Sequence, residues 1–146
     1  MASTYLCLNA HIVFATKGRA PMIGVDWRDG LHAYVAGTLR GLGADPYAVG
    51  GVADHVHILV AIKATHCIAD LVRETKKASS SWSRERQERF AWQEGYAAFS
   101  VGRDSLKPLA VYIGNQEEHH RTRTSVDELR SLLAEHGIEY DERFFE

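Results

Sequence analysis

The chain has 146 residues, of which 45% are hydrophobic and 25% are charged, and this size and balance indicate a single domain over residues 1–146. Its longest apolar runs are far shorter than the roughly 20 residues that span a bilayer, and its first residues lack the basic region and cleavage site of a signal peptide, so we expect a cytoplasmic protein without membrane contact. The two cysteines are too few for a disulfide framework, and the net charge of −2 gives no indication of nucleic-acid binding.

The first part of the chain predicts three strands and one helix. Residues 4–16 are rich in β-branched and aromatic residues and predict a strand, which a loop with Gly and Pro follows. Residues 31–42 carry apolar side chains at helical spacing and predict a helix with glycines at its end. Residues 45–62 predict two strands that are joined around Gly50 and Gly51.

A second helix and a fourth strand come next. Residues 68–82 have helical spacing, and residues 91–102 alternate well enough for a strand. The resulting order βαββαβ is typical of an α+β, ferredoxin-like split βαβ domain. We therefore expect a core at residues 4–101, with an antiparallel sheet of four or five strands and helices on one face. The other face is expected to be open.

Two further helices are predicted after this core. Pro108 suits the first turn of a helix at about residues 106–121, because its missing N–H is not needed there. Ser125 and Glu128 form a predicted capping box for a C-terminal helix at about residues 126–136. The first of these helices can dock at the open face of the sheet.

The stretch ADHVHILV, residues 53–60, places two histidines two positions apart in a predicted strand. Because side chains alternate along a strand, His55 and His57 share the open face, and His11 of the first strand can offer its side chain to the same surface. Asp54 points to the opposite face if the strand is regular. Two neutral imidazoles at this spacing can hold one metal ion, although two ordinary strand histidines are the alternative.

Tyr112 and Gln116 are four residues apart, so a helix places them on one face, and His119 or His120 continues that face. Alone, such a tyrosine is most simply a packing residue of an amphipathic helix. The two adjacent histidines are most simply a solvated helix end, although they could support a site.

The blocks VGGVADHVHILV, FAWQEGYAAFSVG and VYIGNQEEHHR follow HIVFATKGRAPMI in an order and spacing that resemble the single-tyrosine HUH transposases of the insertion sequence 200/605 group. The resemblance runs from Tyr5 to about Asp141, and Ala97 stands where that family usually has a glycine. It implies that His55, His57 and Gln116 bind Mg²⁺ or Mn²⁺. It also implies that Tyr112 is the nucleophile.

The resemblance implies an enzyme that cleaves and rejoins single-stranded DNA at the ends of a mobile element, through a 5′-phosphotyrosine intermediate, and that recognises DNA hairpins. It further implies a homodimer with shared active sites, in which Tyr112 docks on the partner's histidines; docking within one chain is the alternative. A domesticated hairpin-binding regulator without transposition is a second hypothesis. An unrelated metal-dependent phosphohydrolase on the same fold is a third. No general base can be named from the sequence.

Basic and aromatic side chains are the remaining candidates for DNA contact. From residue 125 onward the chain holds seven acidic residues against two arginines, a difference of −5, so residues 1–124 carry +3. The residues that we expect to contact DNA are Lys17, Arg19, Arg73, Lys76, Lys77 and His120. For Arg73, Lys76 and Lys77, which form a basic cluster on one predicted helix, a solvated helix face is an equally good explanation. Trp92, Tyr96 and Phe99 could stack on bases, with core packing as the simpler interpretation.

Overall fold

The structure, a computed structural model, describes residues 3–144. Its strands and α-helices follow the order β1 (Leu8–Ala15), α1 (Val25–Gly41), β2 (Asp45–Val52), β3 (His55–Ile62), α2 (Ile68–Arg84), β4 (Ala97–Ser100), α3 (Leu106–Gly114), α4 (Gln116–His119) and α5 (Ser125–Glu135). This order and the pairing below confirm the predicted α+β, ferredoxin-like class. None of the described helices has the length and apolar character that crossing a membrane requires.

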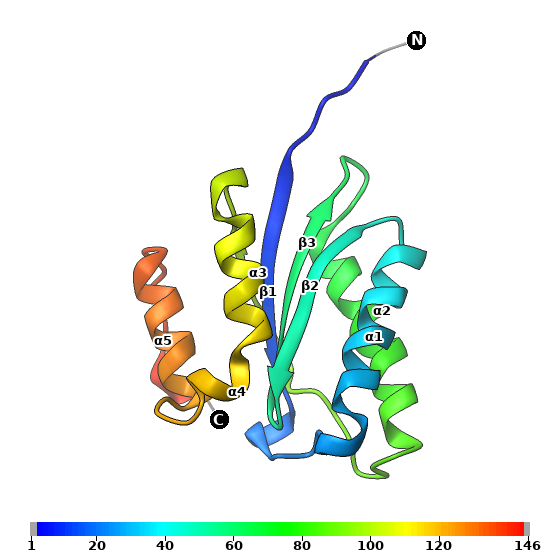
Figure 1. The fold of residues 1–146 in the computed structure, drawn as a ribbon, viewed down its shortest axis with the longest axis vertical. Helices are drawn as coiled ribbons and strands as arrows, with labels where there is room; N and C mark the ends of the chain where they lie inside the picture. The colour runs from blue at the N-terminus through cyan, green and yellow to red at the C-terminus, as the bar shows by residue number, and fades with distance from the viewer. Residues whose placement is uncertain (1–2, 145–146) are drawn as a thin grey trace.

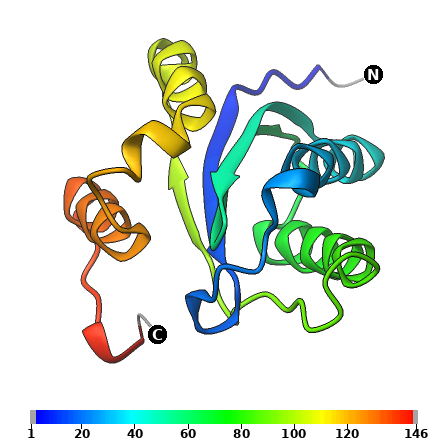
Figure 2. The same cartoon turned by 60° about the horizontal axis from the view of Figure 1, so that its bottom comes forward.

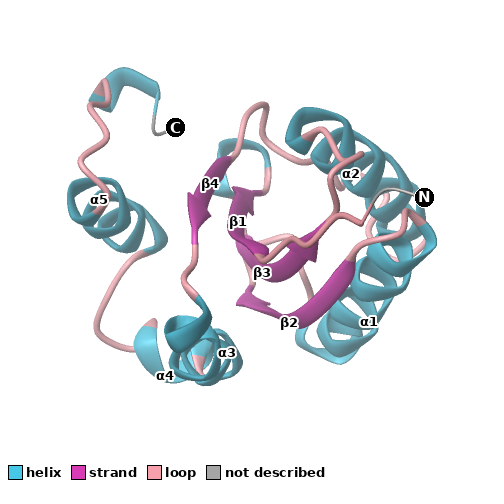
Figure 3. Ribbon diagram, turned by 90° about the horizontal axis from the view of Figure 1, so that it is seen from above, coloured by secondary structure: helices cyan, strands magenta, loops and turns pink. Residues whose placement is uncertain are grey.

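The four strands form one sheet in the order β2-β3-β1-β4, and every neighbouring pair is antiparallel; Figure 1 labels β1, β2 and β3, and Figure 3 labels all four strands. Strand β3 is central, and its residues His55 and His57 pair with Ala15 and Val13 of β1. Side chains on β1 and β3 therefore lie in the middle of both faces of the sheet.

One face of the sheet forms the main hydrophobic core with α1 and α2. Val56, Ile58 and Val60 of β3 are at most 1% exposed and belong to the same cluster as Leu31 of α1 and Leu71 of α2. Their alternation along β3 is the one that the sequence predicts, and it turns the histidines to the opposite face.

The other face is covered as well (Figures 2 and 3). Helices α3, α4 and α5 lie on the side of the sheet opposite to α1 and α2, so the tyrosine-bearing helix docks where the sequence predicts. A smaller apolar cluster joins Val13 of β1, Phe99 of β4 and Leu133 of α5. The expectation that this face is open is wrong, because α5 also packs on it.

The predicted turn at Gly50 and Gly51 is misplaced. Both glycines lie inside β2, and the chain turns after Val52, before β3 begins at His55. A Cβ atom on Gly50 would lie 2.3 Å from the Ile113 carbonyl oxygen, so the glycine allows α3 to approach the strand closely. Gly50 therefore allows close packing of α3 on β2 and does not form a turn.

The predicted helix at about 106–121 is interrupted. Helix α3 ends at Gly114, Asn115 has φ −105° and ψ 27°, and α4 begins at Gln116. Glycine and asparagine both have low helix propensity, which explains the break at this position. The break changes the direction of the chain between Tyr112 in α3 and Gln116 in α4, the two predicted site residues of this segment.

The cap of α5 lies one residue earlier than predicted. Thr124 Oγ1 accepts a hydrogen bond from the Asp127 N–H at 3.1 Å, so Thr124 and not Ser125 is the N-cap. The capping box of Ser125 and Glu128 is therefore wrong. Since Glu128 is not needed at the cap, its side chain is available to the sheet face below α5.

Candidate active site

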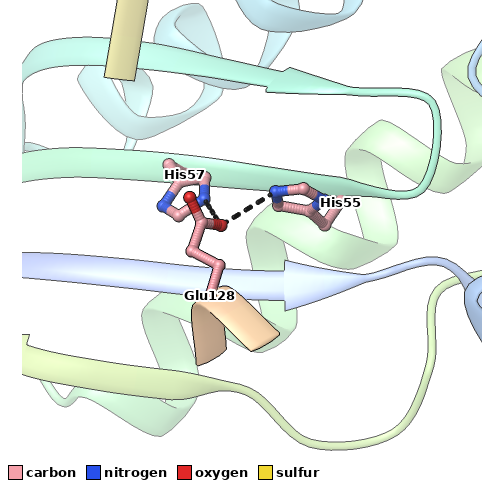
Figure 4. Close-up of side chains that lie close together, drawn as sticks. All are labelled: His55, His57 and Glu128. Atoms are coloured by element: carbon pink, nitrogen blue, oxygen red, sulfur yellow. Dashed lines mark hydrogen bonds and ion pairs between the residues drawn. The ribbon is translucent and has the colours of Figure 1, made fainter. Parts of the chain in front are cut away.

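Three buried side chains from two distant parts of the chain meet at the centre of the site (Figure 4). His55 and His57 project from β3 and are 1% and 0% exposed, and Glu128 projects from α5 and is 2% exposed. Glu128 Oε1 lies 2.7 Å from His57 Nε2 and 3.3 Å from His55 Nε2. The histidines are thus covered by a carboxylate and do not face solvent.

The second ring nitrogen of each histidine has a partner of its own. His55 Nδ1 lies 2.7 Å from Asp54 Oδ1, and His57 Nδ1 lies 2.7 Å from His11 Nε2. These contacts leave both Nε2 atoms facing Glu128, and outer partners orient the histidines of metal sites in the same way. Burial, followed by the proximity of His57, lowers the pKa of His11 to about 3. His11 is therefore neutral, and its Nε2–H can donate to His57 Nδ1, because the N–H of His57 is on the Nε2 atom that bonds Glu128.

Asp54 links His55 to α5. Its Oδ2 accepts a hydrogen bond from Ser125 Oγ at 3.0 Å, and Ser125 Oγ accepts one from Arg19 Nη1 at 3.0 Å. Burial opposes ionisation of Asp54, but the hydrogen bonds from His55 and Ser125 outweigh it and lower its pKa. The expectation that Asp54 points away from His55 is wrong, because Asp54 belongs to the turn before β3 and not to the regular strand.

Tyr112 reaches the same carboxylate from α3. Its hydroxyl donates a hydrogen bond to Glu128 Oε2, while the other carboxylate oxygen faces the histidines. Burial and then contact with the Glu128 carboxylate raise the pKa of the Tyr112 hydroxyl. Burial disfavours the charged form of Glu128, but hydrogen bonds from His55, His57 and Tyr112 dominate and hold its pKa well below the usual range. Glu128 is therefore an ionised acceptor that touches the tyrosine hydroxyl.

Gln116 completes the ring of polar groups. The side chain is 1% exposed, and its Oε1 lies 3.2 Å from His55 Nε2 and 3.0 Å from His120 Nε2. Its Nε2 donates to Glu128 Oε2 at 3.3 Å. The interpretation of His120 as part of a solvated helix end is wrong, because the break at Asn115 turns this segment inward.

The structure thus brings together every predicted catalytic and metal-binding side chain. His55, His57, Gln116 and Tyr112 all contact Glu128, and Tyr112 and His57 come from segments 55 residues apart in the sequence. In the described chain, Tyr112 lies beside the histidines of the same chain, which is the cis alternative. The shared site of a homodimer stays a prediction.

The residues predicted to contact DNA divide into two groups. Arg19 and His120 lie on the side of the site, since Arg19 bonds Ser125 and His120 bonds Gln116, and Lys17 is exposed in the same short 3-10 helix as Arg19. Arg73, Lys76 and Lys77 lie on α2, beyond the sheet from the histidines, and Lys76 Nζ donates to the carbonyls of Gln93 and Gly95. A DNA-binding role for either group stays a prediction.

Two of the three aromatic candidates pack into the protein. Phe99 belongs to the small cluster below α5, and Trp92 contacts the rings of Phe14 and Phe90. Tyr96, by contrast, is 43% exposed.

Glu128 is the functional residue that the sequence did not reveal. Its spacing from Ser125 fits a helix cap, so the residue has an ordinary explanation. The sequence TSVDE offers two capping pairs, Thr124 with Asp127 and Ser125 with Glu128, and only one can form. Because Thr124 and Asp127 can cap the helix, Glu128 is available for another role, and this is the one indication of it in the sequence.

The donor set fits a divalent cation. One ligand atom from each of His55, His57 and Glu128 can be chosen so that all lie within 4.8 Å of one another, all three residues being buried. The amide oxygen of Gln116, which is neutral, adds a fourth donor beside His55. Carboxylate and amide oxygens suit Mg²⁺ and Mn²⁺, and imidazole suits transition metals, so the mixed set is compatible with Mn²⁺, Mg²⁺ or Zn²⁺.

Comparisons with known proteins agree with this arrangement. The family described as Transposase IS200 like matches residues 4–116. Among curated proteins, none is similar enough in sequence to match.

Two solved structures share the fold. A Deinococcus radiodurans R1 protein assigned as a transposase is 23% identical, with a TM-score of 0.63 over 80% of this chain and 96% of that chain. The REP-associated tyrosine transposase bound to a REP hairpin is 13% identical, with a TM-score of 0.61 over 82% of this chain and 74% of that chain. The family match covers all four strands and helices α1, α2 and α3, ends before α5, and shows that this chain belongs to the IS200-like transposase family.

Proposed function

We propose that the protein is a metal-dependent transposase that cleaves and rejoins single-stranded DNA through a 5′-phosphotyrosine at Tyr112. The observation that carries this proposal is the position of Glu128, which contacts the Tyr112 hydroxyl with one oxygen and both histidines with the other. A packing tyrosine needs only an acceptor for its hydroxyl, whereas the acceptor of Tyr112 also contacts both histidines. The family consists of DNA-cleaving, strand-transferring enzymes, which supports the same reaction class.

The chemistry assigned to the chain begins with the Tyr112 oxygen. This oxygen forms a bond to the scissile phosphorus, the bond from phosphorus to the 3′-oxygen breaks, and the strand leaves with a 3′-OH after that oxygen gains a proton. The phenolic proton leaves to solvent as this bond forms, and Glu128 Oε2, which accepts the hydrogen bond of the Tyr112 hydroxyl, orients that hydroxyl for attack. Burial and the Glu128 carboxylate both raise the pKa of Tyr112, so the hydroxyl keeps its proton until the attack. The phosphotyrosine keeps the energy of the phosphodiester bond for rejoining.

His55, His57, Gln116 and Glu128 Oε1 would hold the Mg²⁺ or Mn²⁺ ion. When bound, the ion neutralises negative charge on the phosphate oxygens during attack. Asp54 bonds Nδ1 of His55, and His11 bonds Nδ1 of His57, so both rings are held with Nε2 toward the metal site.

We assign hairpin-bearing single-stranded DNA as the partner, in the cytoplasm. The relative that is bound to a REP hairpin supports a hairpin substrate. Arg19, which bonds Ser125 beside the site, supports a contact of Lys17 and Arg19 with the strand, whereas Arg73, Lys76 and Lys77 of α2 lie beyond the sheet.

The test is a covalent adduct on a denaturing gel after incubation with single-stranded DNA that carries the end of the protein's own element. Wild-type protein should form the adduct with Mn²⁺ and lose it with chelator. Tyr112→Phe should form none, because only the phenolic oxygen is removed, and Tyr96→Phe is the matched control that keeps it. An adduct of undiminished yield in Tyr112→Phe would assign the nucleophile to another residue.

A homodimer with shared sites is tested by mixing Tyr112→Phe chains with His57→Ala chains. If each tyrosine serves the partner's histidines, a heterodimer contains one intact site and adduct formation returns after subunit exchange. Proven heterodimers that form no adduct would mean that each chain uses its own tyrosine, which is the arrangement of the described chain.

A further inference from the structure

A cavity of about 290 Å³ lies beside the site and is lined in part by residues of β4 and α5. Val13 of β1, Ala97 of β4 and Leu133 of α5 supply apolar lining. His55 also lines the cavity, so the cavity and the proposed metal site share a residue. Whatever occupies the cavity therefore lies next to the phosphate that Tyr112 would attack.

We propose that this cavity binds one unpaired nucleobase of the DNA strand, adjacent to the scissile phosphate. The proposal rests on the proposed function, and it adds a site that would select the base at the cleavage position. The cavity is at the small end of the roughly 300–1,000 Å³ range of small-molecule sites. Its volume has room for a single base.

The polar groups around the cavity favour a nucleotide with its base inside. Tyr96 lines the cavity and is 43% exposed, so its ring is accessible for stacking on a base. Glu94 also lines it, and a carboxylate repels a phosphate but accepts a hydrogen bond from the amino group of a base. Arg19 lines both this cavity and a second groove, so it lies at the boundary between them. Its positive charge can bind the backbone phosphate of the nucleotide there.

The wall formed by residues 93–96 is held in place by the rest of the protein. The Gln93 N–H donates to the Ala15 carbonyl at 2.8 Å, and the Gly18 N–H donates to Gln93 Oε1 at 2.8 Å. Lys76 Nζ donates to the carbonyls of Gln93 at 2.8 Å and Gly95 at 2.6 Å. The cavity is therefore formed before any ligand binds, and Lys76 positions its wall from the far side of the sheet.

The experiment measures binding of dAMP, dCMP, dGMP and TMP by calorimetry in the presence of chelator, with deoxyribose 5-phosphate as the base-free probe. At least one nucleotide should bind about tenfold more tightly than the base-free probe, the scale of one base-stacking contact. Equal affinity for deoxyribose 5-phosphate would make the cavity a phosphate site and overturn the proposal, as would no binding of any nucleotide.

Two variants of adjacent residues in β4 locate the binding. Ala97→Leu fills the cavity and should remove the preference for the base, whereas Ala98→Leu lies on the other face of the strand, is exposed, and should keep it. Tyr96→Ala removes an exposed ring, leaves the core intact and should lower the nucleotide affinity about tenfold. Tyr96→Phe keeps the ring and should bind the nucleotide with unchanged affinity. If Ala97→Leu and Tyr96→Ala both bind as their controls do, the assignment is wrong.

The adduct assay on the same preparations separates this proposal from the proposed function. An adduct at Tyr112 together with nucleotide binding that ignores Ala97→Leu and Tyr96→Ala would overturn the cavity assignment alone. Nucleotide binding that depends on Ala97 and Tyr96, without any adduct, would confirm the cavity and overturn the transposase chemistry.

Discussion

The two faces of β3 lie on the same eight residues and are built in different ways. Toward α1 and α2, Val56 and Ile58 bury apolar side chains in the main core. Toward α3 and α5, His55 and His57 bury polar atoms that are bonded to Glu128 and to outer partners. The first face gains its stability from burial without directional contacts, and the second depends on directional contacts that any single substitution interrupts. Stability and chemistry are thus assigned to opposite sides of one strand.

A large effect on the histidine face alone is expected from Glu128→Gln. The amide keeps the size of the side chain but removes the charge that orients the Tyr112 hydroxyl and faces the metal site, so adduct formation should slow by about 10²–10³-fold, the scale of losing one electrostatic contact at the reacting atoms. A single-turnover time course at saturating Mn²⁺ measures it. Glu135→Gln, exposed on the same helix, is the control and should keep the wild-type rate. A normal rate in Glu128→Gln would remove this carboxylate from the reaction.

The second comparison sets Ile58→Ala against His57→Ala. Ile58→Ala should lower the free energy of unfolding by about 2–5 kcal/mol through lost burial and a cavity, and the folded fraction should still form the adduct. His57→Ala leaves partners in the polar network unpaired and should cost about 1–3 kcal/mol, but it should abolish the adduct. Urea unfolding and the adduct gel give both values. A loss of adduct per folded molecule in Ile58→Ala would break the division between the faces.

A smaller effect is expected from His11→Ala, which removes the outer partner of His57. Loss of such a partner should weaken Mn²⁺ binding by about 10–100-fold without removing a metal ligand. Electron paramagnetic resonance of free Mn²⁺ measures the affinity. The control is His66→Ala, because His66 bonds Lys63 and Leu42 and not the site. Equal affinities in the two variants would mean that the His57 ring needs no support.

The apolar core was predictable because it depends on local periodicity. The alternation of β3 and the spacing of Leu31 and Leu71 in their helices report directly which side chains are buried. Tyr112 and Gln116 were predictable only from the family resemblance, since their spacing alone fits an ordinary amphipathic helix.

Other parts of the site depend on contacts that no local pattern encodes. Glu128 meets His57 across 71 residues of sequence, and its spacing from Ser125 points to a cap. Gly50 looks like a turn residue, although its role is to admit the Ile113 carbonyl. Asn115 breaks a helix whose spacing is regular on both sides. In each case the local sequence is compatible with two structures, and the packing of α3 and α5 on the sheet determines which of them forms.

The central claim is that the buried carboxylate of α5 presents Tyr112 to DNA as the nucleophile. The most direct test is proteolysis of the wild-type adduct followed by tandem mass spectrometry of the DNA-linked peptide. The account predicts a single modified peptide, with the 5′-phosphate of the DNA on the Tyr112 oxygen and a free 3′-OH on the released strand. A phosphate carried by Tyr96 or by any other side chain, or cleavage without a covalent peptide, would contradict it.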